Sequence, residues 1–141
     1  MAQAVTQKMV ADAGRSNQIR VDSAGTHANH SGEWPDARAE AALARRGYSA
    51  TRAKSRKVTP RDFQNFDLIV AMDSNNLAEL RRLCPPEHLT KLSLFMDYAN
   101  GLSGCDVPDP YYGNAQGFEK VLDLCEAGAT GLIKQIFQRD D

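Results

Sequence analysis

The stretch DLIVAMDSNNL, residues Asp67–Leu77, decides the fold of this chain. Its first six residues, Asp67–Met72, form a nearly continuous apolar run instead of the alternation that marks a half-exposed strand. Such runs are typical of parallel strands that are covered on both faces. Asp73-Ser74 then leads directly into a helical pattern over Asn75–Leu83. The stretch therefore predicts a buried strand followed at once by a helix.

The rest of the chain alternates in a similar way. Leu92–Phe95 has the pattern of the next short apolar strand, and Ile19–Asp22 that of an earlier one. Helical spacing of apolar residues, proline at helix starts and glycine after helix ends mark the other helices. These are Met1–Ala13 before Gly14, Pro35–Arg46 before Gly47, a brief helix from Pro60 with Thr59 as N-cap, and Ala115 to about Phe137, which Gly128 and Gly131 interrupt.

Strands that alternate with helices predict an α/β fold of three layers, in which helices flank both faces of a parallel sheet. A chain of 141 residues can form one core, and no linker or repeat divides it, so we expect a single domain over residues 1–141. Three strands are few for five helices. We therefore expect that a first strand, ahead of the first helix, is absent from this sequence.

Parallel sheets of this kind bind ligands at the carboxyl ends of their strands. Three segments are expected at that edge: Ser23–His30, Met72–Asn75 and the loop that contains Asp109. A functional site, if these segments form one, is predicted where they meet.

Composition excludes several classes of function. Apolar residues make up 42% and charged residues 25%, as in ordinary globular domains. A net charge of −1 gives no electrostatic reason to expect nucleic acid or an anionic membrane as a partner. No apolar run approaches the ~20 residues of a membrane span, and no secretory signal is evident, so we expect a cytoplasmic protein. Three widely spaced cysteines favour reduced thiols over disulfides or a zinc site, and we expect no metal and no cofactor.

The loop Asp106–Gly113 (DVPDPYYG) carries the strongest chemical signal. Its two prolines restrict the backbone, so the Asp109 carboxylate is held on a stiff tether. Tyr111 and Tyr112 follow directly, which places two amphipathic rings beside a proton carrier. The loop predicts an acid next to an aromatic wall. The alternative is an ordinary Pro-Asp-Pro turn with a half-buried tyrosine.

Four segments taken together resemble the low-molecular-weight protein tyrosine phosphatases. They are Asp22–Thr26 (DSAGT), Pro35–Arg38 (PDAR), Phe66–Leu77 and Asp106–Gly113, which stand in the order and approximate spacing of that family. The resemblance implies a parallel sheet of four strands flanked by helices. It also implies a nucleophilic cysteine in a phosphate-binding loop, Cys followed by five residues and Arg-Ser/Thr, between the first strand and the first helix.

That loop does not occur in this sequence. Counting six residues onward from each cysteine gives Thr90 for Cys84, Tyr111 for Cys105 and Gly131 for Cys125, and none of these is arginine. We therefore expect an N-terminally truncated chain without the family's first strand, phosphate loop and nucleophile.

The resemblance assigns Asp109 as the general acid that protonates the leaving phenolate and later assists the attacking water. Tyr111 and Tyr112 match the aromatic wall against a phosphotyrosine ring. Asn29 stands where many members have an aromatic residue at the rim of the pocket, and His30 lies beside it in the sequence. Both are expected to contact substrate, with solvation alone as the plainer interpretation of a lone loop histidine.

Two further residues match supporting positions of the family. Ser23 corresponds to a hydroxyl whose hydrogen bonds help to shape the phosphate loop, and Asp73 lies at a strand end near the site. Each has a plainer interpretation: Ser23 as a turn hydroxyl and Asp73 as a helix cap.

These observations support three hypotheses. The first is a phosphatase for phosphotyrosine proteins or small phosphate esters, inactive in these 141 residues because the nucleophile is missing. The second is a non-catalytic binding module that presents the Tyr111-Tyr112 rim, or sheet edges that pair or exchange strands between copies in a homo-oligomer. The third, a thiol-dependent arsenate reductase, ranks lower because Ala71–Asp73 stands where further redox cysteines are needed.

Overall fold

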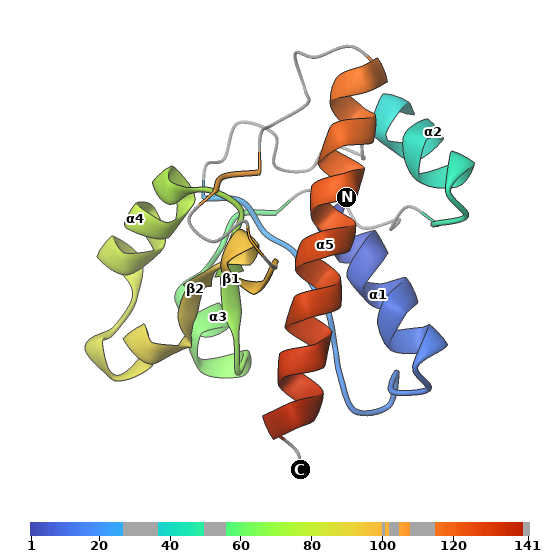
Figure 1. Ribbon diagram of the computed structural model, residues 1–141. Coiled ribbons are helices and arrows are strands. Elements are labelled where there is room, and N and C mark those ends of the chain that lie inside the picture. The colour runs from blue at the N-terminus through green and yellow to red at the C-terminus, as the bar shows by residue number, and fades with distance from the viewer. Residues whose placement is uncertain (27–36, 50–55, 100, 102–104, 108–114, 140–141) are drawn as a thin grey trace.

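The computed structural model describes residues 1–26, 37–49, 56–99, 101, 105–107 and 115–139 (Figure 1). Most of the helices expected from the sequence are present, each within a few residues of its predicted bounds. In chain order the elements are α1 (Ala2–Asp12), α2 (Ala37–Arg45), α3 (Pro60–Asn65), β1 (Ile69–Ala71), α4 (Ser74–Leu83), the 3₁₀ helix η1 (Pro86–Lys91), β2 (Leu92–Leu94), the 3₁₀ helix η2 (Phe95–Tyr98) and α5 (Ala115–Arg139).

The two strands pair in parallel. Ile69 lies opposite Leu92 and Ala71 opposite Leu94, with α4 and η1 connecting the strands. β1 lies within the apolar run Asp67–Met72, so the strand predicted there is confirmed, as is the one at Leu92–Phe95.

The side chains around β1 alternate between two hydrophobic cores. Leu68, Val70 and Met72 pack against a core built mainly from α1, α2 and α5. Ile69 and Ala71 pack on the other face, where α3 and α4 contribute the partners. Figure 1 shows α3 and α4 on one side of the strands and α5 with α1 on the other, which confirms the expected helices on both faces.

The strand predicted over Ile19–Asp22 is wrong. This segment forms no ladder, and only an isolated bridge between Gly25 and Lys57 comes after it. The carbonyl of Val21 instead accepts the side-chain amides of Gln3 and Gln7, at 3.4 and 3.3 Å. An extended segment becomes a strand only when a neighbour pairs with its backbone. The described part of the sheet therefore has two strands, and the four-stranded sheet of the family stays a prediction.

The predicted interruption of the last helix is also wrong, because α5 is continuous through Gly128 and Gly131. A Cβ at Gly128 would lie 2.2 Å from Cε1 of Phe95, and one at Gly131 would lie 1.7 Å from the carbonyl oxygen of Tyr98. These glycines serve close packing rather than a break, because their missing side chains let η2 lie directly on α5.

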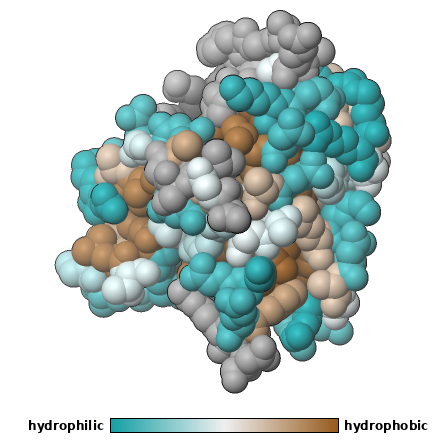
Figure 2. Space-filling model, in the orientation of Figure 1, coloured by the Kyte–Doolittle hydropathy of each residue, from teal (hydrophilic) through white to brown (hydrophobic). Residues whose placement is uncertain are grey.

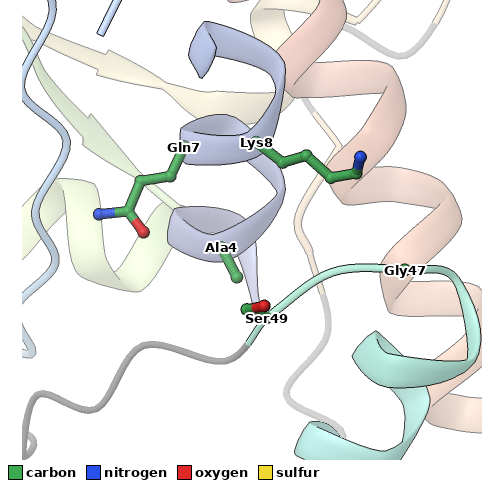
Figure 3. A pocket seen from close by; sticks show the side chains of 5 residues that line it. All are labelled: Ala4, Gln7, Lys8, Gly47 and Ser49. Carbon is green, nitrogen blue, oxygen red and sulfur yellow. The ribbon is translucent and has the colours of Figure 1, made fainter. Parts of the chain in front are cut away.

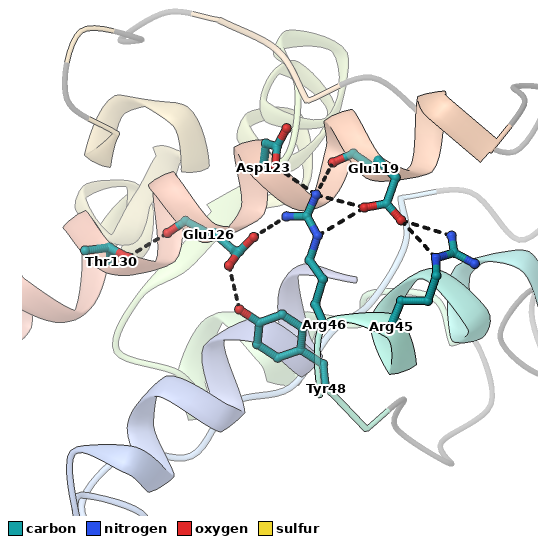
Figure 4. A network of polar contacts seen from close by, with 7 residues as sticks. All are labelled: Arg45, Arg46, Tyr48, Glu119, Asp123, Glu126 and Thr130. Carbon is teal, nitrogen blue, oxygen red and sulfur yellow. Dashed lines mark hydrogen bonds and ion pairs between the residues drawn. The ribbon is translucent and has the colours of Figure 1, made fainter.

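A cluster of charged groups fastens the end of α2 to α5 (Figure 4). The Arg46 guanidinium lies 2.8 Å from both Glu119 and Asp123 and also contacts Glu126. Tyr48 donates its hydroxyl proton to Glu126 at 2.8 Å. Burial and this carboxylate raise the pKa of Tyr48 to about 12, so the hydroxyl remains a donor at all physiological pH values. We call these residues the α2–α5 clamp.

A second cluster of charged groups connects Asp22, which lies shortly before the Gly25–Lys57 bridge, with α3. Arg56 contacts Asp62 at 2.9 Å and Asp22 at 3.3 Å. Asp62 also accepts the backbone N–H of Thr59 at 2.8 Å, which confirms Thr59 as the N-cap of α3. Burial alone would raise the pKa of Asp62, but hydrogen bonds from Arg56 and Thr59 outweigh it and hold that pKa below its usual range.

The face seen in Figure 2 is mostly polar, with several hydrophobic areas between the polar ones. Figure 2 shows hydrophobic surface over the region of α4 and η1, where Leu83 and Leu89 are 38% and 42% exposed. No described helix is long and apolar enough to cross a membrane.

We predict that Gly131→Ala destabilises the protein by about 1–3 kcal/mol, because the added methyl meets backbone that a rotamer change cannot move. Helix propensity alone would favour alanine by about 1 kcal/mol, so the sign of the effect tests the contact. Gly128→Ala should be destabilising too, but partly rescued by Phe95→Leu, which shortens the clashing side chain. Urea unfolding of the single and double variants measures both effects.

Thr130 is exposed and directly precedes Gly131. The substitution Thr130→Ala therefore serves as a control and should change stability by less than about 0.5 kcal/mol. Phe95→Leu should give no rescue of Gly131→Ala, since that clash involves Tyr98. Unchanged or increased stability of Gly131→Ala would refute the close contact between η2 and α5.

The lowered pKa of Asp62 predicts that the difference in unfolding free energy between the parent protein and the variant Asp62→Asn depends on pH. A carboxyl whose pKa is depressed by folding contributes stability that is fully present above its unfolded pKa of about 3.9 and is lost as the pH falls from there through the lower pKa of the folded state. Asp62→Asn should therefore cost about 1–3 kcal/mol at pH 7, and its stability gap to the parent protein should narrow as the pH falls from about 5 to about 3 and below. Urea unfolding across this range measures the gap.

Asp12→Asn is the matched control, because Asp12 is an exposed partner of Lys8 and its replacement should matter little at any pH. A stability gap for Asp62→Asn that stays constant down to pH 3 would contradict the assignment.

Candidate active site

Three segments far apart in the sequence meet at the carboxyl end of β1. The N–H of Val107 donates to the carbonyl of Met72 at 2.9 Å. The side-chain amide of Asn76 donates to Oγ1 of Thr26 at 3.1 Å, and Thr26 is buried. Hydrogen bonds thus join the described parts of the segments expected there from the sequence. Their meeting confirms that this edge of the sheet was correctly located.

The N-terminus of α4 is the centre of this edge. Asp73 is the N-cap, and its Oδ1 accepts the N–H of Asn76 at 2.7 Å. Oδ1 of Asp106 accepts both the N–H and the hydroxyl of Ser74, each at 2.9 Å. Two carboxylates therefore satisfy backbone donors of the first turn, where negative charge is favoured by the helix dipole.

Of the two supporting residues, Asp73 fills the plainer role of a helix cap. Ser23 donates its hydroxyl to Oε1 of Gln3 at 2.6 Å, so it faces α1 rather than α4. The remaining predicted site residues lie outside the described residues: Asp109, Tyr111, Tyr112, Asn29 and His30.

The sequence placed Thr26 and Asp106 at this edge only as members of the expected segments and assigned neither a role of its own. It did not place Asn76 there, because that residue stood out only as part of a helix start and of a family motif. A signal existed for Asp106, since it stands directly before the apolar and proline residues of its loop. Its partner Ser74, however, is 32 residues away, and no local pattern links the two.

The thiols do not have the environment of a nucleophile. Burial raises the pKa of the Cys84 thiol, and it raises that of Cys125 to about 11. A reactive cysteine needs a lowered pKa, because the thiolate is the attacking species. Cys105 is exposed, and no arginine stands six residues after it. None of the three cysteines therefore fits the family's nucleophile.

A surface cavity of about 330 Å³ lies away from this edge, between α1 and the turn after α2 (Figure 3). Its charged or polar side chains do not converge, because Gln7 and Lys8 point to opposite sides of α1. In the described ranges, no three His, Cys, Asp or Glu side chains are grouped so as to hold a metal. The carboxyl end of β1 is therefore the candidate active site.

Comparisons with known proteins agree with the fold. The family described as low molecular weight phosphotyrosine protein phosphatase matches residues 1–140. A low molecular weight protein-tyrosine-phosphatase of Streptomyces coelicolor is 43% identical over 139 residues, covering 96% of this chain and 84% of the relative. The low molecular weight phosphotyrosine protein phosphatase of Homo sapiens is 35% identical over 127 residues, covering 89% of this chain and 79% of the relative.

Solved structures give the same result. A protein tyrosine phosphatase from Entamoeba histolytica, with Hepes in its active site, superposes with a TM-score of 0.93 at 35% identity and covers 99% of this chain and 89% of its own. The chain therefore belongs to the low molecular weight phosphotyrosine protein phosphatase family.

Proposed function

We propose that this protein acts in the hydrolysis of phosphotyrosine monoesters. We further propose that its 141 residues supply the general acid of that reaction but no nucleophile. The meeting of Thr26, Ser74, Asn76 and Asp106 at the carboxyl end of β1 supports the proposal, because it builds the edge from which the loop with Asp109 departs. Family membership provides the substrate class.

Asp109 is proposed as the general acid. It lies two residues after Val107, and an extended chain spans at most about 7 Å over that interval. Val107 is buried, and its N–H is bonded to the end of β1. Asp109 therefore follows, within two residues, a position that is anchored at this edge. Asp106 is not proposed as the acid, because its carboxylate accepts hydrogen bonds from Ser74 at the start of α4.

The reaction requires a thiolate nucleophile, a general acid, an attacking water and groups that stabilise the phosphoryl oxygens. A thiolate attacks phosphorus and the P–O bond to the phenol breaks, while Asp109 gives its proton to the leaving oxygen. Water then attacks the cysteinyl-phosphate, Asp109 takes the proton from water, and phosphate leaves. Backbone N–H groups and an arginine stabilise the phosphoryl oxygens throughout. These residues contain no Cys-x5-Arg motif to provide the thiolate and arginine.

Substrate binding is assigned to two rims. Tyr111 and Tyr112 form the proposed wall against the phosphotyrosine ring, and Asn29 with His30 forms the opposite rim. We further propose a cytoplasmic protein, since its free cysteines suit a reducing compartment.

We predict that the purified 141-residue chain does not hydrolyse p-nitrophenyl phosphate. A version extended at the N-terminus by a family-like strand and Cys-x5-Arg-Ser loop should hydrolyse it. In that extended version, Asp109→Asn should lower kcat for phenyl phosphate by about 10²–10⁴ and lower it less for p-nitrophenyl phosphate, whose phenol leaves more readily. Steady-state kinetics with both esters measures these effects.

The matched control is Asp67→Asn, an exposed aspartate at the other end of β1, which should leave kcat unchanged. Clear turnover by the 141-residue chain, abolished by Asp109→Asn, would refute the proposed inactivity. An inactive extended version that is folded would refute the proposed function.

One observation favours the second hypothesis, a homo-oligomer formed through sheet edges. β1 pairs with β2 on one side, and no strand pairs with its other side among the described residues. Unpaired edges promote pairing between copies. We predict a concentration-dependent dimer for the 141-residue chain in size-exclusion chromatography with light scattering. A monomer at all concentrations that melts cooperatively would contradict this prediction.

A further inference from the structure

The stem of the loop with Asp109 is held at three points. The Asp106 carboxylate accepts two hydrogen bonds from Ser74, both at 2.9 Å. The next residue, Val107, donates its N–H to Met72 at 2.9 Å. The side chain of Val107 is 6% exposed and belongs to the core that contains Phe118. A carboxylate, a backbone amide and an apolar side chain therefore fix two consecutive residues.

The residues directly after this stem transmit its position. Pro108 comes next, so the φ angle of one residue is fixed and the conformations of Val107 are restricted. Asp109 is then only one residue further.

The three contacts are not of equal kind. Burial of Val107 and its bond to Met72 place the stem beside β1. The bonds from Asp106 to Ser74 are the ones that link it to α4, and they involve exposed groups. Exposed contacts of this kind add little to global stability. A side chain that contributes little to overall stability yet fixes the direction of a loop is suited to positioning.

We propose that Asp106, through Ser74, is a positioning residue that fixes the stem of the loop carrying the proposed general acid. This inference rests on the proposed role of Asp109. Asp106 and Ser74 act as one unit, because both hydrogen bonds end on the same carboxylate oxygen. An acceptor at position 106 is what the contact needs, so asparagine can replace aspartate in part.

The first experiment measures hydrogen exchange of the Val107 amide in the 141-residue chain by NMR, which needs no catalytic activity. Asp106→Ala should speed this exchange about ten-fold, and Ser74→Ala by less, because one bond remains. The double variant should exchange no faster than Asp106→Ala alone. Asp106→Asn should restore part of the protection. Asp67→Ala, at the other end of β1, should have no effect.

The second experiment measures kinetics in the version extended by the strand and the Cys-x5-Arg-Ser loop. Asp106→Ala should lower kcat for phenyl phosphate at least about ten-fold and lower it less for p-nitrophenyl phosphate, which needs Asp109 for hydrolysis of the cysteinyl-phosphate but hardly for departure of its phenol. A purely structural role would lower kcat for both esters equally. Asp106→Asn should recover part of the lost kcat for phenyl phosphate.

The outcomes separate the two proposals. Unchanged Val107 exchange in Asp106→Ala would overturn the positioning role whatever the activity. Faster exchange with equal loss for both esters would also overturn it, while an effect of Asp109→Asn on the same esters would leave the proposed function intact. If the folded extended version has no activity, the proposed function fails, while faster Val107 exchange in Asp106→Ala would still support the hold of Asp106 on the stem.

Discussion

The contact between η2 and α5 is the constraint on which the rest of the structure depends. At this contact two glycines, Gly128 and Gly131, lie against Phe95 and the backbone of Tyr98. η2 directly continues β2, so the contact fixes the distance between the sheet and the longest helix. α1 and α2 pack on the same helix and thereby take their places relative to the strands. Protein interiors are close-packed, so one added methyl at this point would have to move backbone.

The two strands then organise two cores and one functional edge. Alternate side chains of β1 reach opposite faces, and each face is covered by its own helices. The edge at the end of β1 is built differently, from polar contacts among side chains and backbone. Thr26, Ser74, Asn76 and Asp106 are joined by hydrogen bonds rather than by burial of apolar surface. Directional bonds of this kind fix orientation, which a site for chemistry needs more than it needs stability.

The chemical character of the chain depends on what surrounds its ionisable groups. Carboxylates gather at the start of α4, where backbone donors and the helix dipole favour them. The thiols of Cys84 and Cys125 lie in apolar cores, where burial raises their pKa and makes them unreactive. These 141 residues contain no Cys-x5-Arg motif, and the acid and positioning groups proposed for the phosphatase reaction are carboxylates.

The sequence by itself determined the elements whose signals are local. Thr59, Gly14 and Gly47 mark helix ends, the run Asp67–Met72 marks a doubly covered strand, and motif order marks the family. Only the tertiary structure decided that Ile19–Asp22 forms no strand and that α5 continues through its glycines. It alone joined Arg46 to α5 and Asp106 to Ser74. The physical reason is the same in each case: helix caps and apolar runs act between neighbours in the chain, whereas strand pairing, close packing and side-chain hydrogen bonds require partners that folding brings together.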